Sequence, residues 1–93
     1  MPSESSIVAG ISRYLKANKI WHMKVHGNGC QRVGIPDIIG CVGGQMFALE
    51  VKRPGEKASK IQQYEIGKLR ESGAVAEVVE SVTAARQLIE PLL

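Results

Sequence analysis

The chain has 93 residues, which is one small domain (residues 1–93), with an ordinary globular balance of 44% hydrophobic and 23% charged residues. The formal net charge of +3 favours a polyanionic partner over an acidic protein or a cationic substrate. No segment is long enough to cross a bilayer, and the first residues lack the basic and apolar regions of a signal peptide, so we expect a cytoplasmic protein.

A helix is predicted over residues 3–18, where apolar residues recur at helical spacing. Its stripe is Ile7, Val8, Ile11 and Leu15. Ser3 or Ser5 would cap its start. Glu4 extends the stripe, so its carboxylate is aimed along the buried face. The alternative is an acid that favours the helix dipole and stays in water.

Residues 20–26 alternate between two faces and predict a half-buried strand. One face carries Ile20, His22, Lys24 and His26, and the other carries Trp21, Met23 and Val25. His22 and His26 would lie about 13 Å apart on a strand, which excludes a shared zinc ion. Cys30 and Cys41 form no CxxC motif, so a disulfide is not expected and the compartment is a reducing one.

The glycine-rich segment 27–34 contains neither GxGxxG nor GK[ST], so it is not a nucleotide-binding loop. Two interpretations stay open. The loop approaches a phosphate backbone, with Gln31 and Arg32 as contacts, or it is a plain connection between strands.

The remaining chain predicts an α/β fold. A strand at 37–42 and a strand at 45–52 are joined by a turn at Gly43-Gly44, and Pro54-Gly55 breaks the second strand. A helix follows at 59–72, which Ser59 caps and Gly73 ends. The chain closes with a strand at 74–79 and a helix that starts at Ser81 or Thr83 and turns Val82, Ala85, Leu88 and Ile89 inward. The order α-β-β-β-α-β-α contains one hairpin and one right-handed crossover.

Three charged residues mark a candidate site at the ends of the two hairpin strands. Glu50 and Lys52 are two apart, so they point to the same side of their strand. Asp37 opens the neighbouring strand and should lie beside Glu50. Two carboxylates suit Mg²⁺ or Mn²⁺, and a lysine can orient a water or offset developing charge.

Gln62 lies on the inward stripe of the helix at 59–72, with Ile66 and Leu69. Buried amides need hydrogen-bond partners. Its partners are either the catalytic groups and a phosphate, or nearby backbone.

The ordered set of motifs resembles a known family. Pro36-Asp37 and Glu50-x-Lys52 resemble the PD-(D/E)XK nuclease signature. GIPDIIG, FALEVKRPG and Ser59-x-x-Gln62 together resemble the VRR-NUC (virus-type replication-repair nuclease) family, in the stand-alone form found in phages and bacteria. The resemblance covers nearly the whole chain. It implies a restriction-endonuclease-like core, a mixed sheet flanked by helices, in a bacterial or phage-infected host cell.

The resemblance also implies roles for the residues. Asp37 and Glu50 would ligate Mg²⁺ or Mn²⁺ with the backbone carbonyl of Val51. Lys52 would position or activate the attacking water. Glu4 would contact the metal directly or through water, and Gln62 would support the site.

The resemblance implies a homodimeric, metal-dependent DNA endonuclease that cleaves Holliday junctions. Candidate phosphate contacts are Lys24, Arg32, Arg53, Lys57 and Lys60. Trp21, Tyr14 and Tyr64 are expected in the core or at a dimer contact, because 4% aromatic residues argue against binding single strands by stacking. The alternatives are a DNA-binding module with weak or partner-dependent cleavage and a small sequence-specific restriction-like nuclease.

Overall fold

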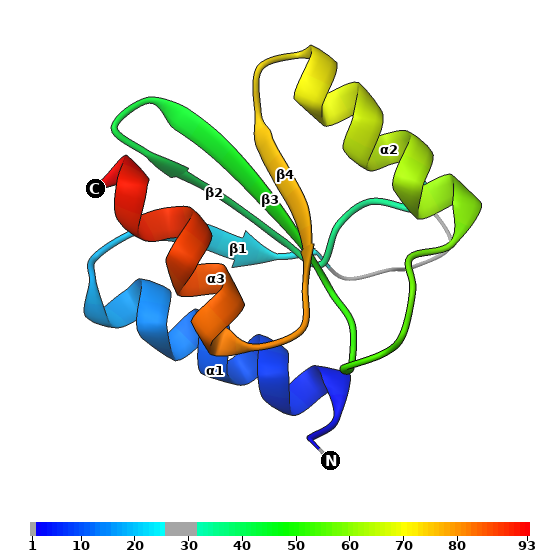
Figure 1. Cartoon of the computed structure of the whole chain (residues 1–93). Helices are drawn as coiled ribbons and strands as arrows, with labels where there is room; N and C mark the ends of the chain where they lie inside the picture. Colours follow the sequence, from blue (N-terminus) through cyan, green and yellow to red (C-terminus); the bar gives the residue numbers. More distant parts are fainter. Residues whose placement is uncertain (1, 26–31) are drawn as a thin grey trace.

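A computed structural model describes residues 2–25 and 32–93 (Figure 1). The elements are α1 (Glu4–Ala17), β1 (Trp21–Lys24), β2 (Ile38–Val42), β3 (Gln45–Val51), α2 (Lys60–Glu71), β4 (Val75–Val79), α3 (Val82–Ile89) and a final 3₁₀ turn, η1 (Glu90–Leu92). The predicted order is confirmed, and the 3₁₀ turn is an addition to it. His26, Cys30 and Gln31 lie outside the described residues, and so do the interpretations that rest on them.

Each helix begins at a serine whose hydroxyl accepts a backbone N–H of the first turn. Ser3 accepts from Ser6 in α1, Ser59 from Gln62 in α2 and Ser81 from Ala84 in α3. These hydroxyls satisfy N–H groups that a helix start leaves without partners. Of the two predicted caps for the first helix, Ser3 is therefore the one used.

The four strands form one mixed sheet in the order β1-β2-β3-β4. The β1–β2 and β2–β3 pairs are antiparallel, and the β3–β4 pair is parallel across α2. Gly43 and Gly44 join β2 to β3 with φ angles of 54° and 85°, a conformation that glycine adopts without strain. The register opposes Ile38 to Leu49, which brings the residues just beyond them, Asp37 and Glu50, to one end of the hairpin.

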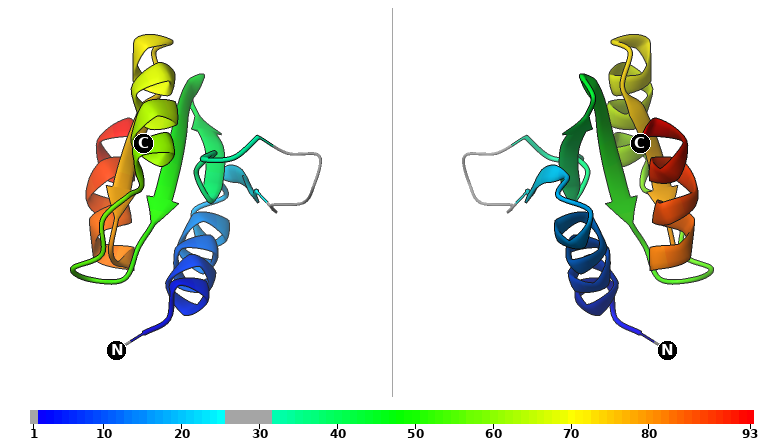
Figure 2. Two further views of the ribbon diagram at one scale, coloured as in Figure 1. Left: turned by 90° about the vertical axis from the view of Figure 1, so that its right-hand side faces the viewer. Right: turned by 90° about the vertical axis from the view of Figure 1, so that its left-hand side faces the viewer.

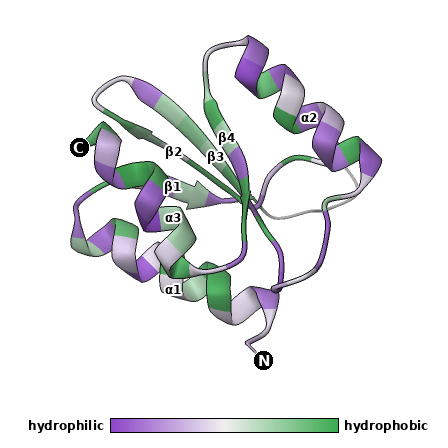
Figure 3. Cartoon of the chain, in the orientation of Figure 1, coloured by the Kyte–Doolittle hydropathy of each residue, from purple (hydrophilic) through white to green (hydrophobic). Residues whose placement is uncertain are grey.

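Helices α1 and α3 cover one face of the sheet, and α2 covers part of the other (Figure 2). The larger core lies beneath α1 and α3. It consists of Ile7, Ile11, Leu15, Ile20, Ile38, Phe47, Leu49, Val51, Val79, Ala85 and Ile89. A smaller cluster beneath α2 contains Ala48, Ile66 and Ala76. Figure 3 shows hydrophobic residues where α1 and α3 meet the sheet, whereas α2 is mostly hydrophilic.

The prediction of a half-buried first strand is wrong for most of β1. Trp21 is 63% exposed and Met23 is 46% exposed, and Lys24 is exposed as well. His22 is half-buried, and its ring bonds to the Ser12 hydroxyl at 2.8 Å. Helix α2 lies over β3 and β4 rather than over β1, so alternation alone did not reveal that the Trp21 face is uncovered.

The prediction of a mixed sheet flanked by helices is confirmed.

The aromatic residues differ in burial. Tyr64 is 56% exposed, and neither it nor Trp21 is in the core, whereas Tyr14 packs partly against the core. No helix in the described part of the chain is long and apolar enough to span a membrane.

Candidate active site

Asp37 and Glu50 meet at the end of the β2–β3 hairpin. The two carboxyl groups are close enough that repulsion from Asp37 helps to raise the pKa of Glu50. Asp37 Oδ2 also accepts the backbone N–H of Val51 at 2.7 Å, which fixes the acid against β3. The buried residue Pro36 precedes it, and the backbone carbonyl of Asp37 accepts the Val25 N–H at 2.8 Å. The local fold thus holds Asp37 in place on both sides.

Glu50 is an acid buried within the sheet, 2% exposed. Burial is the largest cause that raises its pKa, and repulsion from Asp37 adds to it, giving a pKa of about 8. Its Oε1 atom is fully buried and has no hydrogen-bond partner within residues 2–25 and 32–93. An orphaned buried carboxylate oxygen is rare in native proteins and indicates a missing ligand, such as a cation or a water.

Lys52 and Gln62 both approach the other oxygen of Glu50. The Lys52 Nζ lies 3.9 Å from Glu50 Oε2, and the Gln62 Nε2 donates to the same atom at 3.3 Å. Lys52 projects from the end of β3, and its backbone N–H bonds to Val79 of β4. Gln62 also completes the helix cap, because its Oε1 accepts the Ser59 N–H at 2.8 Å. Gln62 therefore contacts both Glu50 and nearby backbone.

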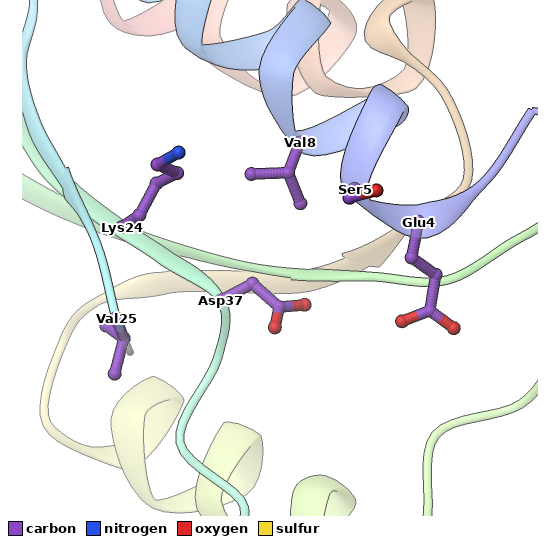
Figure 4. A pocket seen from close by; sticks show the side chains of 6 residues that line it. All are labelled: Glu4, Ser5, Val8, Lys24, Val25 and Asp37. Atoms are coloured by element: carbon purple, nitrogen blue, oxygen red, sulfur yellow. The ribbon is translucent and has the colours of Figure 1, made fainter. Parts of the chain in front are cut away.

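Glu4 reaches the site from the first turn of α1. It lines an open cavity of about 290 Å³ with Asp37 and Lys24, and Figure 4 shows the two carboxylates facing this space. The pKa of Glu4 is raised, chiefly by a hydrogen bond to Glu56 and then by burial. Glu4 is thus half-buried among acids rather than freely solvated at the helix start.

Glu56 is a site residue that the sequence analysis missed. It lies in the turn that follows Lys52, and its Oε1 accepts the Arg53 N–H at 2.9 Å. Side-chain and backbone hydrogen bonds from Arg53 lower its pKa to about 2. Its contact with Glu4 links this turn to α1. No periodic pattern covers residues 53–58, so no signal in the sequence placed Glu56 here.

The predicted phosphate contacts are spread around this site. Lys24 lines the cavity, and Lys57 and Lys60 are exposed. Arg53 pairs with Glu56 at 3.3 Å. The Arg32 guanidinium pairs with Glu65 of α2 at 2.6 Å, a buried partner that the sequence analysis also missed. Glu65 follows Gln62 by three residues and so lies near the same helix face, which was the available signal.

The site suits a divalent cation held by few protein ligands. Asp37 and Glu50 offer carboxylate oxygens, and the orphaned Oε1 of Glu50 lacks the partner that a cation would supply. Nowhere in the described ranges do three or more His, Cys, Asp or Glu side chains form a ready metal cluster. Two carboxylates agree with Mg²⁺ or Mn²⁺, because Mg²⁺ usually keeps several of its waters.

Solved structures share the fold of this chain. No protein-family model and no curated protein matches the chain in sequence. A structure titled "VRR_NUC domain protein" superposes with a TM-score of 0.84 at 17% identity, covering 98% of this chain and 88% of that one. A second, titled "VRR_NUC domain", gives a TM-score of 0.78 at 27% identity and covers 94% of both chains.

A third similar structure is Hjc of Archaeoglobus fulgidus, a Holliday junction resolvase from an archaeal hyperthermophile. Its TM-score is 0.62 at 24% identity, over 80% of this chain and 64% of that one. The first two superpositions cover nearly the whole chain. The predicted resemblance is therefore confirmed: this chain has the fold of VRR-NUC domain proteins, which it shares in part with a Holliday junction resolvase.

Proposed function

We propose that the protein is a metal-dependent DNA endonuclease that hydrolyses phosphodiester bonds in branched DNA, with four-way junctions as its main substrate. The observation that carries this proposal is Glu50, a buried acid with a raised pKa and an unpartnered oxygen, beside Asp37 and Lys52. The VRR-NUC likeness and the likeness to a Holliday junction resolvase support the substrate class.

Each site residue has a role that follows from its position. Asp37, Glu50 and the Val51 carbonyl would hold Mg²⁺ or Mn²⁺, which lowers the pKa of a bound water and offsets charge on the phosphate. Lys52 is beside Glu50 and orients the attacking water through its ammonium group. Gln62 keeps Glu50 in its rotamer by hydrogen bonding. Glu4 adds a further acid at the cavity mouth.

The test is cleavage of a labelled four-way junction and a linear duplex of the same sequence, with Mg²⁺, Mn²⁺ or EDTA. We expect metal-dependent nicks in the junction and about 100-fold slower cleavage by Lys52→Ala, within the range for loss of one charge-stabilising group. Cleavage by Lys52→Ala at the wild-type rate would refute the catalytic role. Binding without nicks in any metal favours a DNA-binding module, and nicks confined to one sequence favour a restriction-like nuclease.

We also propose a homodimer, because a two-fold pair of sites matches the two symmetric strands of a four-way junction. The uncovered face of β1, β2 and the start of β3 offers a surface. Trp21, Cys41 and Met46 lie on it in register, and Met23 is beside them. Exposed apolar side chains grouped on one face are typical of an interface.

Light scattering should give twice the 10.1 kDa chain mass for the wild type. Met23→Lys should be monomeric, because it places a charge in the apolar face. Leu93→Lys is the matched control: it places the same charge on another exposed apolar side chain, in the C-terminal tail. A wild type that is monomeric at all concentrations contradicts the proposal. If Leu93→Lys is monomeric and Met23→Lys is dimeric, the dimer interface includes the C-terminal tail instead of this sheet face.

A further inference from the structure

The ion pair between Arg32 and Glu65 joins a nearly buried acid to a mostly exposed arginine. The distance from Arg32 Nη2 to Glu65 Oε2 is 2.6 Å, and the two side chains are 72% and 8% exposed. In the pairs Arg53–Glu56, Lys68–Glu71, Arg70–Glu77 and Arg86–Glu90 both partners are substantially exposed. Burying a carboxylate is unfavourable unless its partner compensates, so Glu65 is an unusual choice for this position.

The pair lies beside the candidate active site. Glu65 is one helical turn after Gln62, whose side chain bonds to Glu50. On the other partner's side, the chain from Arg32 runs through Gly34 into Asp37. Gly34 has a φ of 90°, and a Cβ there would lie 2.9 Å from the Ile61 carbonyl oxygen of α2. This segment therefore lies tightly against the start of α2.

The geometry leaves most of the guanidinium available. A guanidinium carries five N–H donors in a rigid plane, and Glu65 engages one nitrogen of Arg32. The rest of the exposed side chain can donate to a second anion. A buried carboxylate that fixes one edge of an arginine removes the rotamer freedom that a phosphate would otherwise have to restrict.

We propose that Arg32 binds a backbone phosphate of the DNA next to the active site and that Glu65 is a positioning residue that holds its guanidinium in the binding orientation. The proposal rests on the proposed nuclease function and adds a named phosphate contact with its support. Because a phosphate carries no sequence information, Arg32 should contribute to affinity for junction and linear duplex alike.

Charge alone makes the opposite prediction for Glu65, which gives a clean test. Glu65→Gln removes one negative charge and so raises the net charge of the protein by one. If Glu65 did not position Arg32, this change alone would strengthen DNA binding. Glu77→Gln is the matched control: it changes the net charge equally, and its partner Arg70 lies in an exposed pair 2.9 Å apart between α2 and β4.

The experiment measures binding of fluorescent junction DNA in EDTA over a range of salt concentrations. We expect Arg32→Ala to weaken binding about tenfold and to lower the slope of log K against log salt by about one. Glu65→Gln should weaken binding about threefold despite its added charge, and Glu77→Gln should not weaken it. The double variant Arg32→Ala/Glu65→Gln should bind no worse than Arg32→Ala, because both changes remove the same contact.

The outcomes separate this inference from the proposed function. A wild type that binds and cleaves DNA, with Arg32→Ala equal to it in affinity and slope, overturns the inference alone. Glu65→Gln binding as tightly as Glu77→Gln overturns the positioning role. If Glu65→Gln does not fold, Arg32→Lys is the test, because it keeps the positive charge and removes the planar guanidinium. Weaker DNA binding by Arg32→Lys would support a positioned guanidinium, and wild-type affinity would contradict it. A wild type that binds no DNA refutes the proposed function itself.

Discussion

The sheet face beneath α1 and α3 and the face beneath α2 bury different kinds of side chain. The first face holds a continuous apolar cluster from Ile7 to Ile89, including Phe47 and Leu49 of β3. The second holds only a small apolar cluster, and next to it are Glu50, Gln62 and Glu65. Both faces share one strand. Because buried apolar area drives folding, the larger cluster of the first face contributes more hydrophobic stabilisation, and the second face keeps groups that oppose folding.

The largest effect should come from removing an apolar side chain on the first face. Phe47→Ala should lower the free energy of unfolding by about 3–5 kcal/mol, because it leaves a cavity in the core. Met46→Ala is the control on the opposite face of the same strand, where the side chain is 38% exposed, and should cost under about 1 kcal/mol. Urea unfolding measures both. Equal losses would show that the two faces contribute alike.

The next effect concerns pH and the buried acid. The pKa of Glu50 is raised from 4.5 to about 8, so the folded protein holds this proton more tightly than the unfolded chain. Its contribution to stability is therefore fully present below pH 4.5 and is lost as the pH rises to 8, by up to about 1.4 kcal/mol per pH unit. Glu50→Gln should remove this slope from the metal-free protein.

Unfolding by urea at intervals from pH 5 to pH 8 measures the slope for each variant in EDTA. Glu71→Gln is the control, since Glu71 is an exposed acid of a weak surface pair. It should keep the wild-type slope. Parallel slopes for Glu50→Gln and the wild type would show that the buried acid does not oppose folding at neutral pH.

A smaller effect separates the two contacts of Gln62. Ser59→Ala removes the helix cap and should cost about 1 kcal/mol of stability, while the Gln62–Glu50 contact remains and cleavage is maintained. Gln62→Ala should lose a similar amount of stability and also slow cleavage, because Glu50 loses a donor. Thermal melts and junction cleavage measure the two properties. If Ser59→Ala slows junction cleavage as much as Gln62→Ala does, Gln62 contributes to folding and not separately to cleavage.

The smallest effect should come from the surface ion pair on the α2 side. Glu77→Gln breaks the contact with Arg70, in which the side chains are 44% and 52% exposed. Exposed pairs contribute about 0.2–1 kcal/mol, so we expect a change of under about 0.5 kcal/mol that disappears in high salt. A larger, salt-independent loss would mean that the packing of α2 on β4 depends on this pair.

The sequence predicted the elements, and it predicted that Glu50, Lys52 and Gln62 lie close together, because both depend on periodic patterns. Strand alternation put Glu50 and Lys52 on one face, and helical spacing put Gln62 beside them. Exposure of Trp21 was not predictable, because alternation does not say which part of a sheet a helix covers. Glu56 was missed because its turn has no period, and Glu65 because its buried position depends on Arg32, far away in the chain.

Gln62 touches two structures through one amide group: its oxygen holds the Ser59 N–H, and its nitrogen holds Glu50. A fluctuation that displaces the Gln62 side chain therefore disturbs the start of α2 and Glu50 together. Hydrogen exchange at the Ser59 amide should therefore report on the position of the Gln62 side chain that contacts Glu50. A cation that immobilises Glu50 should slow exchange at this amide. The exchange rate of the Ser59 N–H would then measure cation binding at Glu50, although Ser59 itself does not contact the cation.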